Sequence, residues 1–273
     1  MAFPIIGYRN ILRNTGAATT ASSTEAGFAA ADLHDYKPWK IWKSAVVTSP
    51  INIVLDLGVG NEVTADYLAI INHNLTSLGG TVELLDGAAS PAADQVVAPF
   101  TPDSDNLHVE LFTVTSPARR YWRLQLVHSA PPFSSAPFIG EVFLGLRTTL
   151  TEYMSPGIDP FMTNVESRTQ RSEGGQYLGG TMRGKSHRFQ FSFSAAGIAR
   201  AAYTSDLNTF IDDHLELRRP FVFVLDSADT DFKVPKYLRL TDGGQVTRQA
   251  VGGVWSRLGW SFQVQEAFSE PVA

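Results

Sequence analysis

Short apolar runs of β-strand length, separated by segments rich in Gly, Asn, Asp or Pro, recur through the first half of this chain. The six runs are Ala31 to Asp35, with Trp39 and Trp42 after it, and then Ile51 to Gly58, Tyr67 to Leu75, Thr81 to Gly87, Tyr121 to Leu126 and Ile139 to Gly145. In the run that begins at Ile51, apolar residues occupy positions 51, 53, 55 and 57, which share one face because successive side chains of a strand alternate. Runs of this length and spacing are typical of a β-sandwich. We therefore predict a mainly all-β chain with a jelly-roll-like β-sandwich over residues 31–150.

One connection within this sandwich is suggested by turn-forming residues. Leu111 to Val114 and Tyr121 to Val127 both have strand character, and the six residues between them include Ser116 and Pro117. A connection of this length suits a turn between two antiparallel strands. We therefore expect these two segments to pair with each other.

A second set of patterns follows a segment rich in proline and glycine, Tyr153 to Pro160, which predicts a linker. From His187 to Ser194, phenylalanines alternate with polar residues, as in a half-buried antiparallel strand. Apolar residues then recur at helical spacing, which predicts a helix near residues 205–217. The sequence thus predicts a second β domain over residues 151–273, with one packed helix.

Residues 1–30 precede the regular pattern. They include a stretch of small residues, Thr15 to Thr24, with too little apolar surface to pack tightly. We interpret residues 1–30 as an arm or an extended segment, and an arm that reaches a neighbouring subunit is one of the two alternatives.

Composition and motifs argue against several functions. The formal net charge is -5 and no basic face stands out, so nucleic acid is not an expected partner. The chain has no cysteine, and no apolar run approaches the roughly 18 residues that a membrane-crossing helix needs. Its first residues lack a secretory signal pattern, so we expect it to be made in the cytoplasm. Nucleophile and phosphate-loop motifs are absent and the six histidines lack metal-hydrolase spacing, so we predict that the protein is not an enzyme.

Aromatic side chains cluster in the first half of the chain. They are Tyr36, Trp39, Trp42, Tyr121, Trp122, Phe133 and Phe138. Exposed aromatic rings provide stacking platforms for sugars, so some of these residues could line a ligand site in the loops. Trp122 lies inside a strand-like run, so we expect it in the core. The sequence alone assigns no ligand-binding residue.

The runs INIVLDLG, YWRLQL and IGEVFLG, in this order, resemble those of discoidin-type modules, which have a galactose-binding-like β-sandwich. The resemblance covers roughly residues 25–148. It implies binding to a surface or a partner, with no catalysis. Some modules of this kind hold a structural calcium ion before the first strong strand, where this chain has Asp32 and Asp35. Two carboxylates with backbone carbonyls could bind calcium, which takes six to eight oxygens, whereas exposed acidic turn residues or a helix cap is the simpler interpretation.

The second half resembles the distal-tail and tail-tip structural proteins of tailed bacteriophages. The resemblance is carried by Gly179 to Ser194, the helix Leu207 to Leu217, Arg219 to Phe223, and Trp260 to Phe268. It implies a tail-tube-like β domain that assembles with itself into a ring of six or three copies. The expected neighbours are other tail-tube and tail-tip proteins and a host surface glycan, and the expected location is the virion tail.

Our first hypothesis is therefore a structural component of a phage tail tip or distal tail, which joins the tail tube to the tip or baseplate. Ring assembly requires strand edges that pair across subunits and no catalytic centre. The alternative is a stand-alone, monomeric carbohydrate-binding protein that uses the discoidin-like module. A third hypothesis is an enzyme with a discoidin-like accessory module, which would need a carboxylate pair or a metal in the second domain.

Overall fold

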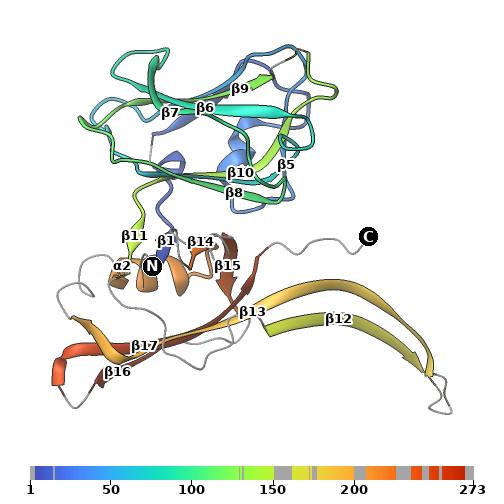
Figure 1. Ribbon diagram of the computed structural model, residues 1–273, viewed down its shortest axis with the longest axis vertical. Helices are drawn as coiled ribbons and strands as arrows, with labels where there is room; N and C mark the ends of the chain where they lie inside the picture. Colours follow the sequence, from blue (N-terminus) through green and yellow to red (C-terminus); the bar gives the residue numbers. More distant parts are fainter. Residues whose placement is uncertain are drawn as a thin grey trace. The chain divides into compact units, whose positions relative to one another are not determined.

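The structure is a computed structural model that describes residues 4–14, 16–128, 130, 132–150, 162–171, 173, 177–199, 207–225, 235–241, 246–251 and 254–267 (Figure 1). The chain forms two compact units. One unit is residues 7–147, and the other combines residues 1–6 with residues 148–273. The predicted linker from Tyr153 to Pro160 lies outside the described residues. The predicted fold class is confirmed, because the described elements are antiparallel β-strands and short helical segments.

The unit of residues 7–147 is a β-sandwich of two antiparallel sheets (Figure 1). In spatial order, the described strands of the first sheet are β2 (Ala18–Ala21), β4 (Ile51–Asp56), β9 (Tyr121–His128), β6 (Gly80–Gly87) and β7 (Asp94–Phe100). Those of the second sheet are β3 (Trp42–Lys43), β10 (Phe138–Gly145), β5 (Tyr67–His73) and β8 (Leu107–Leu111). Five of the six apolar runs of the first half of the chain therefore form strands of the sandwich, whereas the expectation of a strand from Ala31 to Asp35 is wrong, because these residues form a short 3₁₀ turn (Ala30–His34).

The core of the sandwich lies between the two sheets. In β4 and β9, buried and partly exposed residues alternate, so each of these two strands presents one apolar face to the core. β5 is buried along almost its whole length, which matches its continuous apolar sequence. The core cluster includes Leu33, Trp42, Ile70, Trp122, Leu124 and Val142. The predicted burial of Trp122 is confirmed, since none of its surface is exposed.

The predicted pairing of the segment from Leu111 to Val114 with the segment from Tyr121 to Val127 is wrong. β8 ends at Leu111 and pairs with β5, whereas β9 belongs to the other sheet and pairs with β4 and β6. The connection between β8 and β9 therefore crosses from one sheet to the other. Its backbone instead bonds to the segment before β5: the N–H of Phe112 donates to Asp66 O, and a bridge joins Val63 with Arg119.

Residues 1–30, predicted as an arm or extended segment, are divided among several elements. β1 (Ile5–Gly7) pairs with β11 (Thr148–Thr149) in the other unit, with Ile5 opposite Thr149. Within the sandwich unit, β2 pairs with β4 along the edge of the first sheet. Two short 3₁₀ turns, η1 (Ile11–Arg13) and η2 (Ala30–His34), flank β2 in the sequence. The sandwich is thus inserted in the chain between two paired strands of the second unit.

The second unit contains one antiparallel sheet, whose strands differ widely in length. In spatial order, its described strands are β11, β1, β14 (Phe221–Val224), β15 (Lys236–Leu240), β17 (Val254–Glu266), β13 (Tyr177–Ala199) and β12 (Met162–Arg171), and β16 (Thr247–Val251) also pairs with β17. The predicted helix begins with the α-helical turn α2 (Asn208–Phe210) and continues as the π-helical turn η4 (Ile211–Leu215). Among the described residues, no helix is both long enough and apolar enough to cross a membrane.

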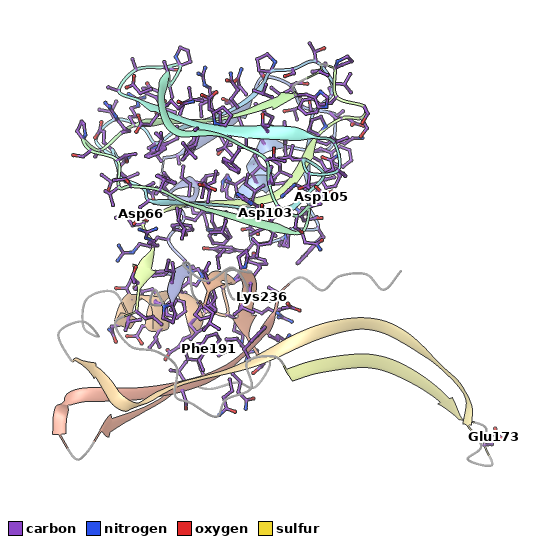
Figure 2. The ribbon with its side chains drawn as sticks, viewed as in Figure 1. Asp66, Asp103, Asp105, Glu173, Phe191 and Lys236 are labelled. Carbon is purple, nitrogen blue, oxygen red and sulfur yellow. The ribbon has the colours of Figure 1, made fainter. Side chains whose placement is uncertain are left out.

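Aromatic rings form much of the core of this unit. Phe191, on β13, lies 4.6 Å from Phe223 and 5.1 Å from Phe262 between ring centroids (Figure 2). Phe210, from the helix, lies 5.0 Å from Phe221 on β14. Phe189 and Phe191 are buried and Gln190 between them is exposed, as the predicted alternation requires. The helix therefore packs through Phe210 onto the same aromatic cluster that joins β13, β14 and β17.

Candidate functional site

Trp39 differs from the other large aromatic residues of the sandwich, because two thirds of its surface is exposed. Its exposed fraction is 66%, whereas Trp42, Trp122 and Phe133 are at most 1% exposed. Burying an indole is favourable, so an exposed one stands out when its neighbours in the sequence are in the core. Of the seven aromatic residues considered from the sequence, Trp39 is the exposed one, whereas Tyr36, Tyr121 and Phe138 are half-buried.

A tight turn presents Trp39 to solvent. The N–H of Lys40 donates to Lys37 O at 2.7 Å, which closes a turn with Pro38 and Trp39 at its centre. Proline is favourable at the second position of such a turn, because its ring fixes φ near the value that the turn requires. The turn is entered through Tyr36, whose φ of 64° lies in the left-handed region.

Side chains of the second sheet hold this turn in place. The Nδ2 of Asn72 donates to Pro38 O at 2.5 Å, and the Tyr36 N–H donates to Glu141 Oε1 at 3.0 Å. Asn72 itself is fixed by its positive φ of 52° and by its N–H, which donates to Asn106 O at 2.8 Å. The turn is therefore anchored on β5 and β10, and Trp39 is held on a rigid support.

Gly140 gives the turn the space that it needs. A Cβ atom at Gly140 would lie 2.2 Å from Pro38 O and 3.0 Å from the Cβ of Asn72. Both contacts are closer than atoms approach without movement, so only glycine allows the turn to lie this close to β10. The backbone of β10 thus passes directly under the residue that precedes Trp39.

The Tyr36 ring completes the support. The Arg13 guanidinium lies 4.1 Å from its centroid, in a cation–π contact, and the Phe143 centroid lies 5.8 Å away. Arg13 also donates to His34 O, which ties η1 to η2. Burial is the main cause that lowers the pKa of His34, and the Arg13 charge adds to it, so this histidine is neutral at pH 7.

The structure brings Asp32 and Asp35, the predicted calcium ligands, to one cation of the chain itself. The Lys40 ammonium lies 3.8 Å from Asp32 Oδ1 and 3.8 Å from Asp35 Oδ2. Asp35 Oδ1 also accepts the Lys37 N–H at 2.8 Å, as in a turn. Among the described residues, no group of three or more His, Asp or Glu side chains could hold a metal ion. The two carboxylates thus lie beside Lys40 in the structure, and calcium binding at Asp32 and Asp35 stays a prediction.

A buried histidine lies next to Asn72 in β5. The N–H of Leu75 donates to His73 Nδ1 at 3.2 Å, so the ring proton belongs on Nε2. Asp105, from the loop before β8, lies 3.5 Å from the same Nδ1 and accepts the Thr76 N–H at 2.8 Å (Figure 2). Burial lowers the pKa of His73 to about 4, even though the Asp105 charge opposes that shift. This histidine therefore organises the turn after β5 as a neutral acceptor.

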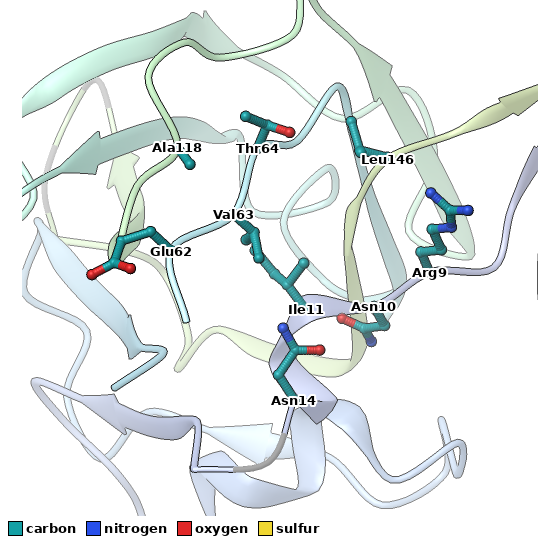
Figure 3. Close-up of a pocket in the computed structure, with 9 residues that line it drawn as sticks. All are labelled: Arg9, Asn10, Ile11, Asn14, Glu62, Val63, Thr64, Ala118 and Leu146. Atoms are coloured by element: carbon teal, nitrogen blue, oxygen red, sulfur yellow. The ribbon is translucent and has the colours of Figure 1, made fainter. Parts of the chain in front are cut away.

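A pocket of about 490 Å³ lies elsewhere on the sandwich unit. Figure 3 shows Ile11 and Val63 together in the middle of its lining, with the polar side chains of Asn14 and Glu62 around them. Asn10 also lines it, but its amide is used by the fold: Nδ2 donates to Val142 O at 2.8 Å and Oδ1 accepts the Leu12 N–H at 3.2 Å. The lining residues include no aromatic ring, so the pocket offers no stacking platform for a sugar.

The sequence identified Trp39 as one of seven candidates, but it did not identify its support. Glu141 lies in a run that predicts a strand, and the sequence pattern places Asn72 in the polar turn that ends another such run, whereas the structure places Asn72 within β5. A signal was present at Gly140, since a glycine inside a strand often marks a close backbone approach. Nothing in the sequence indicated which segment would approach it.

A scan against protein-family models finds no match, and a search of curated proteins finds none either. Among solved structures, the chain is similar to chitosan-binding module 1 of a chitosanase/glucanase from Paenibacillus sp. IK-5, at 22% identity and a TM-score of 0.40 over 50% of this chain and 98% of that one. It is also similar to the module CBM32-5 from Clostridium perfringens, solved with GalNAc-β-1,3-galactose, at 17% identity and a TM-score of 0.39 over 47% of this chain and 94% of that one. A GH29 fucosidase from Ruminococcus gnavus gives 16% identity and a TM-score of 0.40 over 51% of this chain and 27% of that one. These similarities concern a discoidin-like β-sandwich over about half of the chain, and they assign no ligand.

Proposed function

We propose that the sandwich unit is a carbohydrate-binding module that uses the Trp39 turn as its platform. The observation that carries this proposal is that the Trp39 side chain is 66% exposed on a turn that is held by hydrogen bonds. Asn72 donates to Pro38 O, and Glu141 accepts the Tyr36 N–H. An exposed apolar ring on a rigid support loses little conformational freedom on binding, so the contact energy is retained. The proposal involves no reaction.

The chemistry around Trp39 suits a sugar. The apolar face of a pyranose ring can lie against the indole, which is a large and rigid surface. Beside it, the Asn72 amide uses its Nδ2 to hold Pro38, while its Oδ1 accepts no hydrogen bond from any described residue. That oxygen remains available to a sugar hydroxyl. An aromatic platform with a few placed polar groups is the usual composition of a small-ligand site.

The test compares variants of the full chain on an array of neutral and acidic glycans, followed by calorimetry on the best ligand. Trp39→Ala should weaken binding by about 30-fold or more, as expected for a central aromatic contact. Trp39→Phe should retain part of it. Val114→Ala, at another exposed apolar residue of the same unit, is the matched control and should bind as the parent does. Binding that is equal in all variants would refute the proposed site, and an array without any ligand would refute the function.

We infer a second candidate function, a ring-forming structural subunit of a phage tail, from the β12–β13 ribbon. The strands pair from Met162 opposite Arg188 to Arg171 opposite Tyr177. Pairing of β13 with β17 begins only at Arg188, so no described strand pairs with the other edge of residues 177–187. The ribbon extends beyond the rest of its sheet (Figure 1).

A ribbon of this kind favours assembly. Two isolated antiparallel strands are marginally stable in water, and their unpaired edges are templates for another chain. Ten paired residues at ~3.3 Å each give a ribbon of roughly 30 Å, long enough to reach a neighbouring subunit. Head-to-tail contacts that close give a ring, and six or three copies is the order that the resemblance to tail proteins implies. The location in a virion tail and the neighbouring tail proteins belong to this candidate.

Light scattering on the purified chain, followed by negative-stain images, tests this candidate. Rings or short tubes would support it. A monomer near 29.8 kDa at all accessible concentrations would argue against self-assembly and leave the carbohydrate-binding function in place. The two functions are compatible, since they use different units of the chain.

A further inference from the structure

We propose that the ligand at Trp39 is an acidic sugar, recognised through the Lys37 ammonium. This inference rests on the proposed carbohydrate-binding function and concerns the same site. It starts from the charges on the turn, where Lys37 and Lys40 flank the exposed indole in the sequence.

The carboxylates near this turn already have partners, whereas the Lys37 ammonium has none among the described residues. Asp32 and Asp35 share the Lys40 ammonium at 3.8 Å. Asp35 also accepts the backbone N–H of Lys37, and Glu141 accepts that of Tyr36. Lys37 is therefore the cation of the turn that has no ion pair among the described residues, and it lies two residues from Trp39 in the sequence.

An uronic acid matches this arrangement. Its ring offers the same apolar face to the indole as a neutral hexose, and its C6 carboxylate adds one negative charge at the rim of the ring. A charge-assisted hydrogen bond from an ammonium to this carboxylate is roughly twice as strong as one between neutral groups. The Asn72 Oδ1 acceptor would turn toward hydroxyl groups, because a carboxylate offers it no proton.

Trigalacturonate and galactotriose are the probes, because both are trimers of galacto-configured rings and differ in charge at C6. The parent protein should bind trigalacturonate about three- to tenfold more tightly at low salt, and added salt should reduce the difference. Lys37→Gln should remove this preference without affecting galactotriose, and Lys37→Arg should retain it. Lys43→Gln is the control, because it removes the same charge from a lysine that pairs with Glu25 at 2.7 Å.

Each outcome decides the proposal. Equal binding of the two trimers that is lost in Trp39→Ala would overturn the acidic preference and leave the carbohydrate-binding function intact. A preference that survives Lys37→Gln, or that Lys43→Gln removes equally, would overturn the role of Lys37. Failure to bind either trimer, with retained Trp39-dependent binding of a neutral glycan on the array, would also overturn the preference. No binding on trimers or array would refute both proposals.

Discussion

The Nδ1 atom of His73 lies 3.5 Å from Asp105 Oδ1, and the two side chains together hold the turn that follows β5. His73 accepts the N–H of Leu75, and Asp105 accepts those of Thr76 and Ser77. Because the imidazole is completely buried, its neutral form is the one that the fold requires. The stability of β5, which carries Asn72, therefore depends on the protonation state of the His73 imidazole.

The free energy of unfolding should fall as the pH falls from about 6.5 to about 4. The unfolded His73 has an ordinary pKa of 6.5, whereas burial lowers its pKa in the folded state to about 4. The unfolded chain therefore binds more protons in this window, and the loss approaches roughly 3 kcal/mol at its acid end. The raised pKa values of Asp66 and Asp86, both caused mainly by burial, act in the opposite direction.

Urea unfolding of the parent and of His73→Gln from pH 7 to pH 4 checks this prediction. The parent should show the steeper decline, since the carboxylates contribute equally to both proteins. An NMR titration of the parent should place the midpoint of His73 near 4. Parallel pH curves, or a midpoint near 6.5, would contradict the prediction.

The two tryptophans Trp39 and Trp122 should respond in opposite ways to truncation. Trp122→Ala empties a site in the sandwich core and should cost about 3–5 kcal/mol of unfolding free energy. Trp39→Ala removes a surface side chain and should change stability by less than about 0.5 kcal/mol while it weakens glycan binding by about 30-fold or more. Chemical unfolding and calorimetry on the same preparations separate the two effects. A large stability loss in Trp39→Ala would show that the indole serves packing.

Gly140→Ala should move the Trp39 turn without touching Trp39. The added Cβ would lie 2.2 Å from Pro38 O, so the turn must lift from β10. We expect a stability loss of about 1–3 kcal/mol, typical of overpacking, and weaker glycan binding. Gly60→Ala is the control: it adds a Cβ to a glycine with positive φ and no neighbour within 4 Å, so it should reduce stability slightly and leave binding unchanged. Unaltered binding by Gly140→Ala would show that the site tolerates a displaced turn.

A proline in β12 should reduce assembly if the ribbon forms the contact between subunits. Thr169 pairs with Gly180 in the ribbon, and proline at this position removes a backbone donor and restricts φ. Thr169→Pro should lower the mass of any oligomer measured by light scattering, whereas Thr169→Ala should not. Oligomers that are unchanged by the proline would place the contact elsewhere.

The sequence predicted those parts of the fold in which burial follows a simple period. β4 and β9 alternate, β5 is continuously apolar, and the phenylalanines of β13 mark its buried face. β7 was not predicted, because its residues are largely exposed and give little apolar signal. The helix was predicted as regular, and its change from α to π geometry at Ile211 has no counterpart in the residue pattern.

The candidate site was harder to predict, because it depends on tertiary contacts. Trp39 and Trp42 are three residues apart, and their sequence surroundings do not tell which one is buried. Pairing decides it: Trp42 lies opposite Ile139 in the second sheet and joins the core, whereas Trp39 lies in the turn before that strand. The positive φ of Asn72 and the close approach at Gly140 likewise follow from contacts between distant segments.

The pairing of β1 with β11 has a consequence for biosynthesis. As the chain leaves the ribosome, residues 4–6 emerge before the sandwich, but Thr148 and Thr149 follow only after the whole sandwich has been made. Within the sandwich, a Cβ built on Gly145 would lie only 2.5 Å from Arg9 O, so folding of this unit brings its two ends together. The loop that separates β1 from β11 is then closed before the two strands meet, and little further entropy is lost when they pair. Folding of the sandwich thus assists folding of the second unit. A variant that slows folding of the sandwich should therefore also slow folding of the second unit.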